Sequence, residues 1–141
     1  MTFDSSGILL TIKGSVLLSK RIEKYKNKPV PFGGYWSPFS GRIEEGEDPK
    51  DCAVRELKEE SGIDVEKSKV KKIGIFNNKK SKFHLFVCEL ESIPTVNLCE
   101  EHTEHGFFDI NKLHIFPDPV DERLMNSLRS FKKIRKKEKN S

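Results

Sequence analysis

The fold is decided by residues 41 to 63, which read GRIEEGEDPKDCAVRELKEESGI. The middle of this stretch predicts a helix. Asp48 can cap its first turn, Pro49 suits the first helical position, and Asp51 adds negative charge near the positive end of the helix dipole. Gly62 can adopt the left-handed conformation that ends a helix. We therefore expect the helix to run from Pro49 to about the residue before this glycine.

Three glutamates share one edge of this predicted helix. Glu56 and Glu60 are one turn apart and Glu59 lies between them, so all three carboxylates project into one neighbourhood. Glu47, just before the cap, can reach back toward the same edge. Oxygen ligands in this number suit Mg²⁺ or Mn²⁺. A solvated acidic face, or ion pairs with neighbouring basic residues, would also explain the cluster.

The same stretch resembles the signature of the Nudix hydrolases. Its nine fixed positions are all matched, by Gly41, Glu47, Arg55, Glu56, Leu57, Glu59, Glu60, Gly62 and Ile63. Outside the signature the likeness is looser, and Ser40 stands where the family usually has the first of two glycines. The resemblance implies an α/β fold, a Nudix-type α/β/α sandwich with a mixed central sheet, in which the signature forms a loop–helix–loop.

The resemblance also implies a metal site. Glu56, Glu59 and Glu60 are similar to the family's ligands for Mg²⁺ or Mn²⁺. The backbone carbonyl of Ser40 is a further expected ligand, because the family's carbonyl ligand at this position needs no particular side chain. Bound divalent ions would neutralise the oxygens of a pyrophosphate linkage and acidify a water molecule.

Other signature residues resemble supporting groups of that site. Arg55 is similar to the residue that orients Glu56. Glu47 resembles a carboxylate that pairs with Arg55 or holds a metal-bound water, so it is a further member of the expected metal site. Gly41 and Gly62 are expected to serve tight turns at the two ends of the signature.

Hydrolysis also requires a carboxylate that removes a proton from the attacking water. The candidates on the helix are Glu59 and Glu60. A glutamate of a later loop is the alternative, and there we prefer Glu104 to Glu101. An ordinary acidic residue of a surface loop would have the same appearance in the sequence.

Four further residues are candidates for substrate binding. Lys20 and Arg21 end a predicted strand beside the site and are candidates to clamp phosphate, although ordinary strand-end charges show the same pattern. Trp36 is a candidate to stack on a base, or else a core residue. Asp118 lies where some relatives place a polar residue that recognises the base. The four histidines show no mutual spacing of a metal site.

Apolar runs on both sides of the helix predict the strands of the sheet. A turn at Lys13 and Gly14 joins the first two in a hairpin. We expect an exposed loop over 23–35, a short strand and loop over 36–46, and a closing helix over 119–134. The predicted strands are residues 7–12, 15–19, 70–76, 83–90 and 106–109.

Composition limits the class of protein. A chain of 141 residues fits one compact domain. No apolar run approaches the roughly 18 residues of a membrane span, and the N-terminus lacks a signal-like segment. Three cysteines without paired spacing favour free thiols and a reducing compartment. We therefore expect a cytoplasmic protein that makes no contact with a membrane.

The positive charge of the chain is concentrated at its C-terminal end. The formal net charge is +4, of which residues 129–141 carry +6, so residues 1–128 carry −2. We divide the chain into a Nudix hydrolase domain, residues 1–128, and a basic helix end and tail, residues 129–141. Such a tail is either a solvated helix end or a binding segment for a polyanion such as RNA.

The expected function is that of a metal-dependent pyrophosphohydrolase. Its substrate would be a small-molecule nucleotide, either a nucleoside triphosphate or another nucleoside diphosphate derivative. The basic tail favours an alternative, removal of pyrophosphate from RNA 5′ ends. A catalytically silent nucleotide-binding sensor is a further alternative, against which the intact carboxylates argue. Family members often pair, so the resemblance also implies a homodimer, although no apolar patch in the sequence indicates one.

Overall fold

The computed structural model describes residues 3–30, 33–78 and 81–115. Strands β1 (Phe3–Ile12) and β2 (Ser15–Arg21) form the predicted hairpin. Lys13 and Gly14 make its turn, with positive φ angles of 47° and 85°. β1 begins earlier than the sequence predicted because it pairs in parallel, from its first residue, with β8 (Ser81–Glu89).

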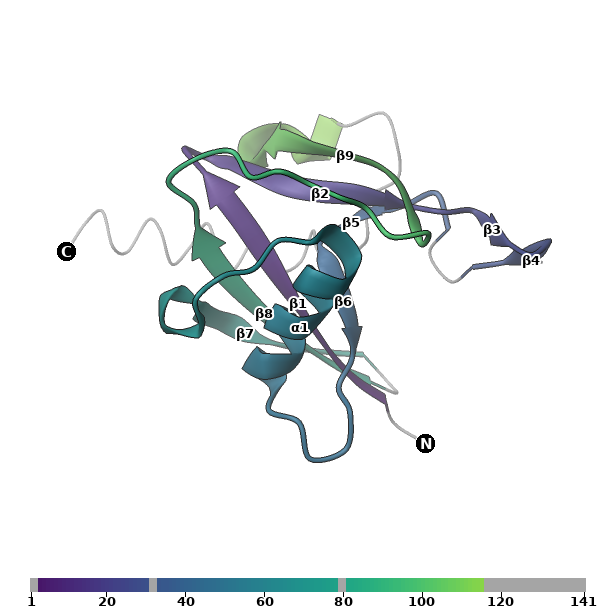
Figure 1. The fold of residues 1–141 in the computed structure, drawn as a ribbon, viewed down its shortest axis with the longest axis horizontal. Coiled ribbons are helices and arrows are strands. Elements are labelled where there is room, and N and C mark those ends of the chain that lie inside the picture. Colours follow the sequence, from purple (N-terminus) through teal and green to yellow (C-terminus); the bar gives the residue numbers. More distant parts are fainter. Residues whose placement is uncertain (1–2, 31–32, 79–80, 116–141) are drawn as a thin grey trace.

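The main sheet has seven strands in the order β5-β2-β1-β8-β7, with β6 on β1 and β9 on β2 (Figure 1). Among the described strands only β1 and β8 run parallel, so the sheet is mixed, as predicted. The segment expected as an exposed loop instead contains a short hairpin that projects from the body, β3 (Lys24–Tyr25) and β4 (Lys28–Pro29). The other strands are β5 (Trp36–Ser37), β6 (Phe39–Arg42), β7 (Lys71–Asn78) and β9 (His102–Asp109).

Helix α1 (Pro49–Ser61) has the predicted ends. The Asp48 carboxylate accepts hydrogen bonds from the backbone N–H groups of Lys50 and Asp51, at 3.0 and 3.4 Å. Gly62 is left-handed, with φ 74°, and its N–H donates to the Lys58 carbonyl at 2.9 Å. Because both ends satisfy backbone groups that a helix leaves unpaired, the boundaries follow from local sequence.

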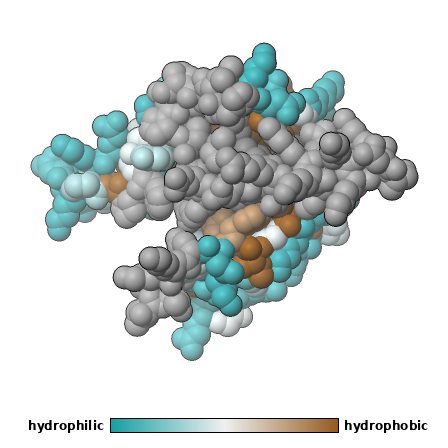
Figure 2. All heavy atoms as spheres, turned by 180° about the vertical axis from the view of Figure 1, so that it is seen from behind, coloured by the Kyte–Doolittle hydropathy of each residue, from teal (hydrophilic) through white to brown (hydrophobic). Residues whose placement is uncertain are grey.

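Each face of the main sheet carries an apolar core. Helix α1 covers one face with Ala53 and Leu57, both fully buried against side chains that include Ile8, Leu17 and Phe39. The opposite face has its own cluster, which includes Leu9, Val16, Leu18, Trp36, Phe83 and Ile110. The last of these begins the 3₁₀ segment η2 (Ile110–Ile115). Seen from behind, the described part of the molecule shows apolar residues at the surface between hydrophilic ones (Figure 2).

Some predictions fall outside the described residues. They are Asp118, the closing helix over 119–134, the boundary at residue 128 and the basic tail.

A short 3₁₀ segment, η1 (Lys67–Lys69), leads into β7. Neither α1 nor any other described helix has the length and apolar character needed to cross a membrane.

Candidate active site

Strand β6 and helix α1 meet at Gly41 and Glu56. The strand passes so close to the helix that a Cβ atom at Gly41 would overlap the Glu56 carboxyl group. Gly41 lies within the strand and its φ is not positive, so the expectation of a tight turn there is wrong. A glycine is required at this position because the strand and the helix approach each other closely there. Gly41 therefore places its backbone beside the Glu56 carboxylate, and Ser40 is the residue before it in the strand.

Arg55 connects the carboxylates of the signature. Its Nε and one terminal nitrogen donate to the two carboxylate oxygens of Glu47, at 2.7 and 3.0 Å. The other terminal nitrogen donates to Glu56 at 3.0 Å and to Glu59 at 3.1 Å. A bidentate ion pair of this kind fixes the orientation of both side chains as well as pairing their charges. The arrangement agrees with the predicted pairing of Glu47 and orientation of Glu56.

The carboxylates differ in how readily they ionise. Arg55, by its hydrogen bonds, lowers the pKa of Glu47 to about 2. Burial raises the pKa of Glu56 to about 7, and the nearby charges of Glu60 and Glu59 add to this effect. Burial also raises the pKa of Glu60, whose side chain is only 5% exposed. Closely spaced, poorly solvated carboxylates favour a bound cation, because the cation removes their mutual repulsion.

The carboxylate of Glu60 faces His102 from strand β9. Their nearest atoms, Oε2 and Nε2, are 3.5 Å apart, and neither has a hydrogen-bond partner among the described residues. The other ring nitrogen, Nδ1, lies 2.8 Å from the Ser19 hydroxyl. The spacing of the histidines along the chain does not indicate this contact, since the contact depends on the pairing of β9 with β2.

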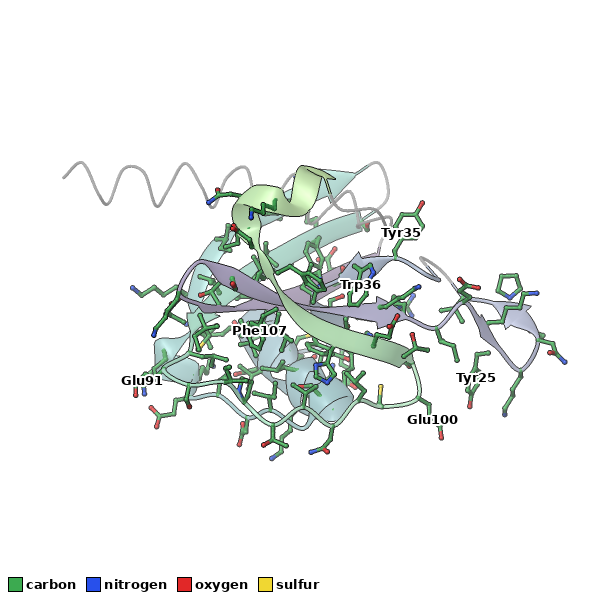
Figure 3. All side chains as sticks on the ribbon, turned by 90° about the horizontal axis from the view of Figure 1, so that it is seen from above. Tyr25, Tyr35, Trp36, Glu91, Glu100 and Phe107 are labelled. Atoms are coloured by element: carbon green, nitrogen blue, oxygen red, sulfur yellow. The ribbon has the colours of Figure 1, made fainter. Side chains whose placement is uncertain are left out.

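A cavity of about 490 Å³ opens beside this end of the helix. Arg21 and Glu101 line it together with Tyr25, and the charge of each of the first two acts on Glu60. Figure 3 shows Tyr25 on the projecting hairpin and Glu100, a further lining residue, in the loop before β9. Of the two strand-end residues predicted to clamp phosphate, Arg21 is therefore the one beside the carboxylates.

The opposite sheet face carries three other predicted residues, Lys20, Trp36 and Glu104. Because side chains alternate along a strand, Lys20 points away from the side on which Ser19 meets His102. Lys20 pairs with Trp36 and Glu104 in the neighbouring strands, and its amine lies 3.8 Å from the Glu104 carboxylate. Trp36 is 6% exposed and packs edge-on against Phe108, so it is a core residue rather than an open stacking surface. The register does not bring Glu104 to the helix carboxylates.

The donor set fits a hard divalent cation. Glu56 and Glu59 contact the same guanidinium nitrogen, and Glu60 has a buried oxygen without a hydrogen-bond partner among the described residues. The backbone at Gly41 runs beside Glu56. Carboxylate and carbonyl oxygens are the ligands that Mg²⁺ and Mn²⁺ prefer.

Comparison with known proteins agrees with this arrangement. A model of the NUDIX domain family matches residues 2–130. An RNA pyrophosphohydrolase from Bartonella quintana is 38% identical over 56 residues, which are 40% of this chain and 32% of that protein. The MutT NUDIX hydrolase from Burkholderia pseudomallei has a similar structure, with a TM-score of 0.77 at 20% identity over 92% of this chain and 98% of that one. The NUDIX domain of Shewanella oneidensis NrtR, solved with ADP ribose, is similar with a TM-score of 0.70 at 17% identity. The match covers 92% of this chain and 87% of that one.

The mixed sheet, with a capped helix that gathers acidic side chains on its face, has the α/β/α sandwich architecture expected from the sequence. The chain belongs to the NUDIX domain family. The signature residues of that family are the ones that cluster in the structure.

Proposed function

We propose that this protein is a metal-dependent pyrophosphohydrolase that cleaves a phosphoanhydride bond in a nucleoside triphosphate or another nucleoside diphosphate derivative. One observation carries the proposal. Glu56, Glu59 and Glu60 gather at one edge of α1, where the charge of Glu60 acts on Glu56. Glu56 and Glu59 contact one guanidinium group, and Glu56 and Glu60 are poorly solvated. A helix that only needed a solvated acidic face would leave these carboxylates exposed.

Different residues around the cluster would bind the metal ions and the phosphates of the substrate. Glu56, Glu60 and the Ser40 carbonyl would hold Mg²⁺ or Mn²⁺, which supplies charge neutralisation and a more acidic water when bound. Arg55 keeps Glu56 in place. Arg21, which lines the cavity, would contact the phosphates. A cavity of this size suits a nucleoside, and ligand pockets commonly span about 300–1,000 Å³.

Proton removal requires a carboxylate that reaches both the cluster and water. Glu59 meets this condition, because its side chain is 58% exposed while one oxygen stays 3.1 Å from Arg55. Glu56 and Glu60 are 15% and 5% exposed and are better placed to hold ions. We therefore assign the general base to Glu59 and not to Glu104, whose carboxylate pairs with Lys20 on the other face.

Replacing Glu60 by Gln tests the proposed function. Loss of a buried metal-facing charge should lower Mg²⁺-dependent phosphate release at least about a hundredfold, with the melting temperature nearly kept. Glu66→Gln is the matched control, because Glu66 is exposed and its side chain caps no helix. Full activity of the Glu60→Gln variant would contradict the assignment.

Removal of pyrophosphate from RNA 5′ ends is the second candidate. The likeness to the Bartonella quintana RNA pyrophosphohydrolase supports it, as do three exposed lysines around Tyr25 on the β3–β4 hairpin, Lys24, Lys26 and Lys28. Aromatic and basic side chains together are typical of single-strand binding. The predicted binding role of the tail, residues 129–141, belongs to the same hypothesis.

A triple Lys→Gln change in the hairpin separates the two candidates. An RNA enzyme should lose about tenfold in apparent affinity for a 5′-triphosphorylated oligonucleotide at low salt, because up to three phosphate contacts disappear. Hydrolysis of ATP by the same variant serves as the internal control. Equal losses for both substrates would reject the RNA candidate. Deleting residues 129–141 repeats the comparison for the tail.

A catalytically silent sensor is the remaining alternative, and the ADP ribose complex of the Shewanella oneidensis NrtR domain is what favours it. The complete set of signature carboxylates argues against it, since binding alone does not need them. Titration calorimetry that detected tight nucleotide binding, without phosphate release in Mg²⁺ or Mn²⁺, would establish the sensor instead.

A further inference from the structure

A second group of metal-binding side chains lies beside Glu60, outside the Nudix signature. Cys99, Glu101 and His102 each offer one ligand atom, and these atoms lie within 4.8 Å of one another. Cys99 lies just before the turn that leads into β9, Glu101 lies in that turn, and His102 is the first residue of the strand. A thiol, an imidazole and a carboxylate form a different donor set from the oxygen ligands of the helix.

The histidine of this group is held as metal-binding histidines usually are. Its Nδ1 is engaged by the Ser19 hydroxyl at 2.8 Å, which fixes the ring and turns Nε2 toward the Glu60 carboxylate, 3.5 Å away. A ligating imidazole typically uses its second nitrogen for such an outer hydrogen bond. The His102 side chain is 1% exposed, and a buried ring nitrogen with no hydrogen-bond partner in the described part of the chain requires an explanation.

The separation between His102 and Glu60 fits a shared ion. His102 Nε2 and Glu60 Oε2, neither of which is hydrogen-bonded to a described residue, are 3.5 Å apart, which is long for a hydrogen bond. Two ligands at about 2.0–2.2 Å from a tetrahedral Zn²⁺ stand roughly 3.4 Å from each other. One cation between them would therefore satisfy both buried atoms.

Backbone hydrogen bonds hold the turn against the end of α1. The Cys99 N–H donates to the Glu60 carbonyl at 2.9 Å, and the His102 N–H donates to the Cys99 carbonyl at 3.3 Å. Strand β9 continues from this turn along β2. The cysteine and the histidine are thus fixed relative to Glu60 by main-chain contacts and not only by flexible side chains.

We propose that Cys99, Glu101 and His102 bind a zinc-class divalent cation, and that Glu60, which faces His102 but lies outside their 4.8 Å group, turns toward the ion as a shared ligand. Thiolate and imidazole ligands select Zn²⁺ or Co²⁺ over Mg²⁺, which prefers oxygen. The inference rests on the proposed function only through Glu60. It predicts a thiophilic ion beside the carboxylate site and a metal preference that the Nudix signature alone would not give.

Cobalt provides a direct probe of the thiol. Co²⁺ titrated into the reduced full-length protein should produce a thiolate-to-cobalt band in the near ultraviolet, which Mg²⁺ ions do not produce. Excess Zn²⁺ should remove the band, and excess Mg²⁺ should leave it. A protein that shows no such band with saturating Co²⁺, or whose band Mg²⁺ removes, overturns the proposal.

Two pairs of variants identify the ligands. Cys99→Ser should abolish the band, while Cys88→Ser, in the core on the α1 face, should keep it. Glu101→Gln should weaken Co²⁺ binding at least about tenfold and its neighbour Glu100→Gln by less than about twofold, because only Glu101 belongs to the ligand group. A band that survives in Cys99→Ser, or equal affinities in the two glutamine variants, refutes the site.

Phosphate release by the wild-type protein separates this inference from the proposed function. A protein that hydrolyses nucleotides in Mg²⁺ but gives no cobalt band contradicts the thiol-containing site alone. A protein that gives the band but hydrolyses no nucleotide contradicts the proposed function and supports this site.

Discussion

At the scale of the residue, position on the sheet decides which acidic group can act. Glu59 and Glu104 are almost equally exposed, at 58% and 60% of their side chains. Glu59 nevertheless contacts the guanidinium group that also holds Glu56, whereas Glu104 pairs with Lys20 on the far side of the sheet. Exposure alone would not separate the two glutamates, but their partners do.

The comparison of Glu59→Gln with Glu104→Gln uses this difference. A missing general base should lower kcat about a hundredfold, while KM for the nucleotide changes little. Glu104→Gln should remain within about twofold of wild type, because an exposed ion pair contributes little. Steady-state phosphate release measures both. If Glu104→Gln were the slower enzyme, the base would have to be reassigned.

At the scale of the element, the contact between β6 and α1 forms the carboxylate cluster. The strand can approach the helix only because Gly41 has no side chain at the Glu56 carboxyl group. The helix itself is fixed by its caps and by Leu57 and Ala53 in the core. Small shifts of the strand therefore change the site before they change the fold.

Gly41→Ala tests this contact. The added methyl group should displace Glu56 and lower Mg²⁺-dependent turnover about a hundredfold, since misplacing a catalytic group by about 1 Å has effects of that size. Gly74→Ala in β7 is the control, because its new Cβ would meet only the Phe76 ring at an ordinary 3.5 Å. Equal activities in the two variants would show that the close approach is unimportant.

The elements also show how far the sequence predicts the structure. Helix α1 could be predicted to the residue because Asp48 and Gly62 determine its ends locally. The sheet face on which Glu104 lies could not be predicted in this way. It depends on the pairing of β9 with β2 and on an irregularity of the register at Lys20 and Arg21. A shift of one residue in a strand moves a side chain to the other face, and no local pattern fixes that register.

At the scale of the whole molecule, the clustered acids link stability to pH. Burial raises the pKa of Glu56 from 4.5 to about 7, so the folded protein holds a proton that the unfolded chain releases. This contribution to stability is complete below about pH 4.5 and is lost as the pH rises toward 7. Glu47 has the opposite sign, but its contribution is lost only as the pH falls from 4.5 to about 2.

The metal-free protein should therefore melt at a lower temperature at about pH 8 than at about pH 5.5. Mg²⁺ should raise the melting temperature more at the higher pH, because the ionised carboxylates bind it. In the Glu56→Gln variant, the melting temperature should depend less on pH, and its increase with Mg²⁺ should also depend less on pH. Thermal unfolding in EDTA and in excess Mg²⁺ provides the measurement, and a stability that rises with pH in EDTA would oppose the account.

The most direct test of the central claim is anomalous diffraction from crystals of this protein soaked in Mn²⁺. We predict a peak about 2.1–2.3 Å from carboxylate oxygens of Glu56 and Glu60, as hard-ion coordination requires. The absence of density at these side chains, with Mn²⁺ bound elsewhere or not at all, would contradict the assignment of the helix as the catalytic metal site.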